Sequence, residues 1–170
     1  MSNLEKEIID IAKLSAAGFY DPVIGRYPEI RHFKNLKNWD FFLTVAIVGS
    51  CLMYLQMEDS EEKLRSIEGK IQDQLNKFHP QAWAALQDLF RFIDTTKKPP
   101  KPKVLDEKAA SEYLNQIIDQ IALSVGFWVV LNLKGATKSE NDFGISSTFA
   151  NLLYKKVGVE LALKYAQNAN

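Results

Sequence analysis

The stretch WDFFLTVAIVGSCLMYLQM, from Trp39 to Met57, decides how this chain folds. It carries no charged side chain between Asp40 and Glu58. Wrapped as a helix, it places apolar side chains on every face, a pattern typical of the central helix of a core or of a membrane span. Which of the two applies depends on whether the rest of the chain supplies enough apolar surface to cover it.

The segments around this stretch read as helices that are apolar on one side only. The first is expected over residues 2–17, with Ser2 as its N-cap and Gly18 just past its end. The clearest helix before Pro80 has apolar side chains that repeat at spacings of three and four residues and so form a stripe along one side. Pro80 ends this helix, and a further helix with a second apolar stripe follows it. The two stripes consist of Leu64, Ile67, Ile71, Leu75 and Phe78, and of Trp83, Leu86, Phe90 and Ile93.

A second segment that is apolar on all sides forms the end of a long helix expected over Asp106–Leu133. This segment, Ile121–Leu133, is a natural neighbour for Trp39–Met57. We expect a polar loop over residues 136–145 and a last helix that begins at Ser146 or Ser147. The sequence therefore predicts an all-α fold, one globular bundle of about six helices over residues 1–170 around a central hydrophobic helix. A Pro/Lys-rich connector spans residues 95–103.

The composition of the chain argues against three classes of protein: nucleic-acid-binding, disulfide-rich and secreted proteins. The chain has 170 residues, and its 21 basic and 21 acidic residues cancel. We therefore do not expect it to bind nucleic acid, because no overall field attracts a polyanion. The single cysteine, Cys51, excludes an internal disulfide framework. The first residues lack the basic and apolar regions of a signal peptide, which favours a cytoplasmic protein.

No motif for catalysis or cofactor binding stands out in the sequence. Gly-x-Ser-x-Gly, the phosphate-binding loop and the dinucleotide fingerprint are all missing. Glu29 and His32 match half of a helical di-iron site, but the second Glu-x-x-His motif that such a site needs is lacking. We therefore predict no catalytic residue, no metal and no cofactor. His79, next to Pro80, is expected at a helix boundary.

The best candidate for binding is the basic and aromatic segment that leads into the central helix. Its predicted binding residues are Arg26, Tyr27, Arg31, His32, Lys34, Lys37 and Asp40. Cations beside aromatic rings hold anionic ligands or acidic partners. In the competing interpretation Tyr27, Ile30 and Phe33 plug the end of the bundle while the cations are simply solvated. Asp40 reads either as a first-turn acid favoured by the helix dipole or as a partly buried functional acid.

These patterns predict a non-enzymatic helical protein that binds a protein partner, as an adaptor or regulator, or that self-associates. Two alternatives stay open. One is a pocket for an apolar or aromatic small molecule between the inner helices, which are rich in aromatic residues. The other is a membrane-associated helix pair: residues 41–57 are uncharged, at the lower edge of the length that spans a bilayer, and follow Arg31, Lys34 and Lys37.

Overall fold

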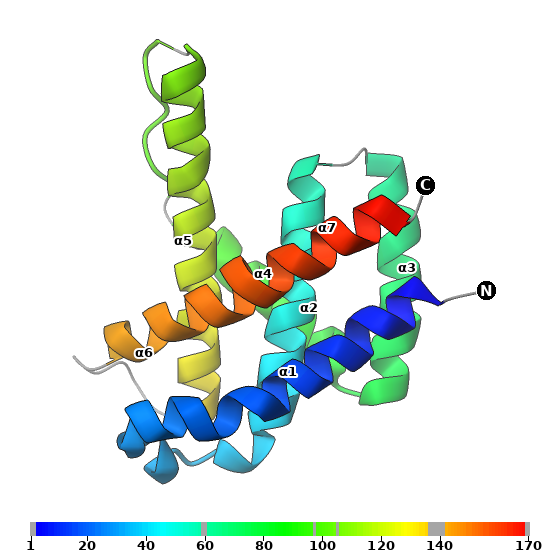
Figure 1. Cartoon of the computed structure of the whole chain (residues 1–170), viewed down its shortest axis with the longest axis vertical. Coiled ribbons are helices and arrows are strands. Elements are labelled where there is room, and N and C mark those ends of the chain that lie inside the picture. The colour runs from blue at the N-terminus through cyan, green and yellow to red at the C-terminus, as the bar shows by residue number, and fades with distance from the viewer. Residues whose placement is uncertain (1–2, 59–60, 97, 105, 136–141, 169–170) are drawn as a thin grey trace.

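A computed structural model describes residues 3–58, 61–96, 98–104, 106–135 and 142–168 of the chain, which form helices and contain no strand. The last three helical segments follow one another without interruption, so the described residues make six helical rods. The predicted all-α bundle is confirmed (Figure 1). In chain order the elements are α1 (Leu4–Arg26), η1 (Pro28–His32), η2 (Leu36–Asn38), α2 (Trp39–Glu58), α3 (Glu61–Phe78), α4 (Ala82–Asp94), α5 (Glu107–Lys134), α6 (Asp142–Phe149), η3 (Ala150–Gly158) and α7 (Val159–Asn168); η1 and η2 are 3-10 turns and η3 is a π-helix.

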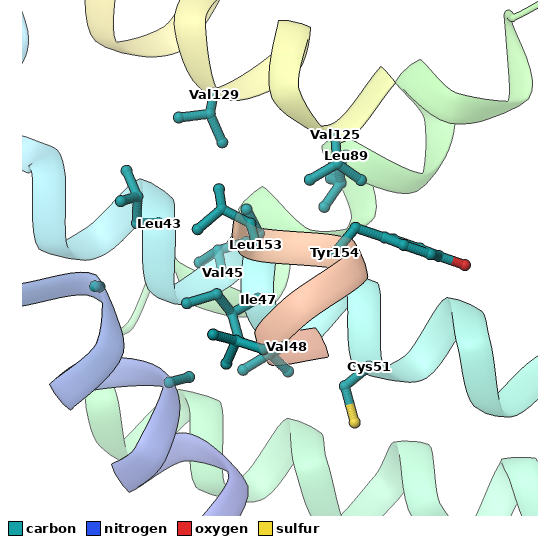
Figure 2. Packing of buried hydrophobic residues seen from close by; sticks show 14 of the residues in the cluster. Leu43, Val45, Ile47, Val48, Cys51, Leu89, Val125, Val129, Leu153 and Tyr154 are labelled. Carbon is teal, nitrogen blue, oxygen red and sulfur yellow. The ribbon is translucent and has the colours of Figure 1, made fainter. Parts of the chain in front are cut away.

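Helix α2 is the centre of the core. Every residue from 43 to 52 is buried, which is nearly three helical turns without an exposed face. Helices α1, α4, α5 and α7 and the π-helix η3 all pack against it. Figure 2 shows Leu43, Ile47 and Cys51 of α2 among side chains from α4, α5 and η3. The prediction that Trp39–Met57 is a core helix is confirmed.

Two helices are long and apolar enough to cross a membrane, judged by length and composition alone. The first is Leu36–Met57. Within its most apolar stretch of 18 residues, 61% is buried inside the molecule. The second is Glu107–Lys134, of whose corresponding stretch 39% is buried. The core helix of a soluble protein meets the same criteria, and the one-sided stripes of α1, α3 and α4 supply the cover that a core helix requires.

Two glycines allow the helices to pack closely around this centre. A Cβ atom on Gly126 of α5 would lie 2.0 Å from the backbone carbonyl oxygen of Ser146 in α6. A Cβ atom on Gly158, the last residue of η3, would lie 2.7 Å from the Cβ of Ser50 in α2. Neither distance leaves room for a side chain, so these contacts between helices depend on glycine. Gly158 is the last residue of the π-helix, and the rod continues into α7 without interruption.

The first helix is longer than predicted. The expected end at Gly18 is wrong, because α1 continues to Arg26 with Pro22 inside it. Proline removes one helical hydrogen bond, but Val23 and Ile24 beyond it are buried at 3% and 4% exposure, and this burial holds the extra turns in place. The predicted cap Ser2 lies outside the described residues. Asn3 is the N-cap, and its Oδ1 accepts the backbone N–H of Lys6 at 2.9 Å.

The last rod begins earlier than predicted. Residues 136–141 lie outside the described part of the chain, but α6 already starts at Asp142, so the expectation of a polar loop through Ile145 is wrong. The carboxylate of Asp142 is buried and accepts from Lys134 Nζ at 3.3 Å, and Ile145 is buried too. Gly135, with φ of 66°, is the C-cap that ends α5 after Lys134, one residue beyond the predicted end at Leu133.

The two halves of α5 have different surroundings. The second half packs on α2, α6 and η3, as expected for a neighbour of the central helix, although Phe127 and Leu131 stay partly exposed. In the first half, residues 107–120, no side chain is buried, and Leu114 is 45% exposed. This half projects beyond the rest of the molecule, with the Pro/Lys-rich connector running beside it (Figure 1). Thr96 joins the connector to α5 through a hydroxyl contact of 2.8 Å with Ser124.

Candidate functional site

The segment between α1 and α2 is fixed to the end of the bundle. The Tyr27 hydroxyl lies 2.9 Å from Thr148 Oγ1 and donates to the carbonyl oxygen of Gly144 at 3.2 Å. Ile30 is fully buried. Asn35 holds the end of α5 twice, through its backbone N–H to Leu133 O at 2.9 Å and its side chain to Asn132 O at 2.8 Å. The segment between α1 and α2 is therefore packed against the bundle through both its side chains and its backbone.

The cations of this segment point away from the bundle. We call Arg26, Arg31, His32, Lys34 and Lys37 the basic segment; all five side chains are exposed. Within the part of the chain that the structure describes, none of them forms an ion pair with a carboxylate. The interpretation of Tyr27, Ile30 and Phe33 as a plug is confirmed, since Phe33 also packs against the core. The plug residues and the exposed cations therefore lie on opposite sides of the same segment.

Arg26 and Tyr27 border a hollow between the end of α1 and the last rod, which we call the α1–α6 groove. The groove has a volume of about 510 Å³. The guanidinium of Arg26 lies 5.4 Å from the centre of the Tyr27 ring, a cation–π arrangement that holds it at the rim. Phe143 is 61% exposed. The lining residues are Pro22, Val23, Arg26, Tyr27, Phe143, Gly144, Ser147, Thr148, Asn151 and Leu152.

Sequence reasoning missed the half of this groove that α6 and η3 supply. Phe143 fell within the expected polar loop, and Ser147 was considered only as a helix cap. An aromatic residue in an otherwise polar stretch, Asn-Asp-Phe-Gly, was the available signal. The pairing with Tyr27, more than a hundred residues earlier in the chain, becomes visible only in the fold.

Lys37 and Asp40 lie in a different place from Arg26 and Tyr27. They line a hollow of about 520 Å³ together with Tyr20, Asp21 and Trp39. Asp40 also borders an adjoining hollow of about 560 Å³ on the outer side of α1. Asp40 itself is exposed, which agrees with the interpretation as a first-turn acid and disagrees with a partly buried one. Both hollows are lined by carboxylates together with a lysine, so the charge of the lining residues does not select one class of ligand.

Two buried ionisable groups lie deep between α2 and η3. Burial raises the pKa of the Cys51 thiol to about 12, so the sulfur stays protonated and unreactive near neutral pH. Burial is the main cause that raises the pKa of Tyr154 to about 12, and the charge of the neighbouring Tyr54 is the smaller cause. The buried hydroxyl of Tyr154 has no hydrogen-bond partner among the described residues. Both groups are neutral parts of the core under ordinary conditions.

Neither histidine is placed as a metal ligand in the described structure. Glu29 and His32 are both exposed on a short 3-10 turn. Throughout the described ranges no group of three or more His, Cys, Asp or Glu side chains could hold a metal ion. His79 is a helix-boundary residue as predicted, and its Nδ1 accepts the backbone N–H of Gln81 at 3.0 Å.

The aromatic residues between the inner helices pack against one another. Phe42 meets Trp128 edge to face with ring centres 5.7 Å apart. Phe41 meets Phe42 edge to face with ring centres 5.1 Å apart, and it contacts the tilted ring of His79 with ring centres 4.7 Å apart. The Trp128 indole N–H donates to Asp88 at 2.9 Å. Edge-to-face packing of this kind is an ordinary arrangement of aromatic residues in a helical core.

Comparison with known proteins adds no further assignment. No protein-family model, no curated protein and no solved structure matches this chain. The candidate sites are a rigidly held, exposed basic segment and the groove beside it.

Proposed function

We propose that this chain is a non-enzymatic interaction protein of the cytoplasm whose basic segment binds an acidic surface or segment of a protein partner. One observation carries the proposal. The backbone of residues 27–38 is fixed by buried contacts, while its cations are exposed and unpaired within the described structure. A cation that no carboxylate of its own chain neutralises is available to a partner, and rigid presentation lowers the entropy lost on binding.

The arrangement of charges supports a protein partner over a nucleic acid. Acidic side chains, Asp21, Glu29 and Asp40, lie exposed in or beside the basic segment. A long polyanion would meet these carboxylates along with the cations, whereas a folded partner can place its own acids selectively. The net charge of the chain, which is zero, also gives no general attraction for a polyanion.

A charge-reversal experiment tests this proposal. The tagged full chain is used to recover partners, and it is compared with a variant in which Arg26, Arg31, Lys34 and Lys37 are all replaced by Glu. These four side chains are exposed, so the variant is expected to fold normally, which circular dichroism verifies. We expect the variant to lose the partners that the native chain recovers, and we expect rising salt to weaken recovery by the native chain.

The matched control reverses four exposed lysines elsewhere on the molecule: Lys70, Lys77, Lys101 and Lys108. It changes the net charge by the same amount but leaves the basic segment intact. Partner recovery by this control is expected to equal that of the native chain. If the two variants behave alike, the basic segment has no specific role and the proposal is wrong.

A further inference from the structure

We propose that the α1–α6 groove is a binding site for a carboxylate attached to an aromatic or branched aliphatic body. This inference goes beyond the proposed function and does not rest on it. The groove takes only Arg26 and Tyr27 from the residues predicted by sequence, and its other wall comes from α6 and η3.

The charge of the groove selects an anion. Arg26 is the one charged side chain among the lining residues that the structure describes, and no ion pair with Arg26 occurs within the described chain. Its guanidinium presents several N–H donors in a planar fork that matches the two oxygens of a carboxylate. The contact with the Tyr27 ring orients this fork at the mouth of the groove.

The walls of the groove select an apolar body. Phe143 stands at the rim with 61% of its surface exposed, and the groove continues along Val23 and Leu152. A large exposed aromatic side chain beside a concave surface typically marks a place where a partner or ligand is buried. A ring or branched aliphatic group laid against Phe143 would cover apolar surface that now faces water.

The floor of the groove is polar and fixed. Tyr27 and Thr148 are held by each other and by the carbonyl oxygen of Gly144, with distances of 2.9, 3.2 and 3.1 Å. Ser147 and Asn151 add a hydroxyl and an amide beside them. The Ser147 hydroxyl and the Asn151 amide can donate to a second carboxylate oxygen, so anion recognition does not depend on Arg26 alone.

Two kinds of molecule carry such a carboxylate: a free small acid, and a peptide chain whose last residue is aromatic or branched aliphatic. Both place one anionic group next to one apolar body. A volume of about 510 Å³ admits either of them.

The test is a titration of the full chain with small probes. Binding is monitored by the NMR shifts of the backbone amides of Gly144 and Asn151. The probes are 3-phenylpropionate, its uncharged amide, and acetate. We expect 3-phenylpropionate to shift these amides with a Kd of about a millimolar, as befits a ligand of this size. The amide and acetate are expected to bind at least about tenfold more weakly, since each lacks one of the two features.

Three variants locate the site. Arg26→Gln and Phe143→Ala, both at exposed positions that tolerate substitution, are expected to weaken 3-phenylpropionate binding by roughly fivefold to tenfold. Arg31→Gln removes the same charge from the same end of the molecule but outside the groove, and it is expected to leave binding unchanged. Equal weakening by Arg31→Gln and Arg26→Gln would overturn the proposal, because it would mean that only general electrostatics acts.

Two peptides separate the possible sources. They are Gly-Gly-Gly-Phe with a free terminal carboxylate and the same peptide ending in an amide. Binding of the free-acid peptide that exceeds 3-phenylpropionate by about tenfold assigns the site to a chain terminus, and equal or weaker binding assigns it to a free acid. No saturable shift with any probe, or equal affinity for acid and amide, would overturn the site itself. Arg26 belongs to both the basic segment and the groove. The charge reversal is therefore also made at Arg31, Lys34 and Lys37 alone, which leaves the groove intact and allows either proposal to fail without the other.

Discussion

Replacement of Gly126 by alanine should destabilise the fold although alanine is the better helix former. Gly126 lies in the buried half of α5, where α6 crosses it. The added Cβ would lie 2.0 Å from Ser146 O and 2.8 Å from Ser146 C. Ordinary carbon–oxygen contacts between helices are about 3.3–3.6 Å. The carbonyl belongs to the backbone, so it cannot rotate away as the end of a side chain could.

The magnitude follows from two opposing terms. Alanine in place of glycine within a helix favours folding by up to about 1 kcal/mol. Overpacking in a core typically costs about 1–3 kcal/mol, and a clash between two backbones belongs at the upper end of that range or above it. We expect a net loss of about 2 kcal/mol. For a chain of this size that corresponds to a decrease in Tm of about 4–8 °C.

Gly69→Ala is the matched control, because Gly69 lies within α3, is exposed, and has nothing within 4 Å of an added Cβ. It should raise stability by about 0.5–1 kcal/mol through helix propensity alone. Both variants are measured by thermal and denaturant unfolding followed by circular dichroism. If Gly126→Ala is as stable as the native chain, or gains as much as Gly69→Ala, then the close crossing of α5 and α6 described above is incorrect.

Two further predictions concern burial along the chain. Leu52→Ala, in the fully buried part of α2, should cost about 2–5 kcal/mol in denaturant unfolding, whereas Leu114→Ala on the projecting half of α5 should change stability by less than about 0.5 kcal/mol; similar losses for both would contradict the assigned burial. The Cys51 thiol, whose ordinary pKa is 9.0, keeps its proton in the folded state until about pH 12. Between pH 9 and pH 12 the unfolded chain has lost the Cys51 proton while the folded chain still holds it. The contribution of the protonated thiol to the free energy of unfolding is therefore fully present below pH 9 and is lost as pH rises toward 12. A thiol reagent at pH 8 should therefore label Cys51 only after unfolding, and rapid labelling of the native chain would refute its burial.

Hydropathy and spacing were enough to predict the fold class. An uncharged stretch such as 41–57 has to be covered, and one-sided stripes elsewhere show where the cover comes from. The burial of Leu43 to Leu52 follows from that argument without reference to tertiary structure. Helix ends were predicted well where a single residue determines them, as with Asp106, whose Oδ1 accepts the N–H of Ala109 at 2.7 Å, and with Gly135.

Helix ends that depend on tertiary contacts were not predictable. Pro22 looks like a helix breaker, and only the burial of Val23 and Ile24 explains why α1 continues through it. Asp142 looks like a loop residue, and its ion pair with Lys134, a contact between residues of two helices, helps to explain its place inside the bundle. The same limit applies to the α1–α6 groove, since its two walls are distant in sequence and meet through Tyr27.

Amide hydrogen exchange of the purified chain in detergent-free buffer tests the central claim most directly. If α2 is the buried centre of a bundle, the amides of residues 43–52 exchange only through global unfolding and are the slowest in the protein. Those of residues 107–120, on the projecting half of α5, exchange faster through local opening. Exchange in residues 43–52 that is as fast as in residues 107–120 would contradict the placement of α2 at the core.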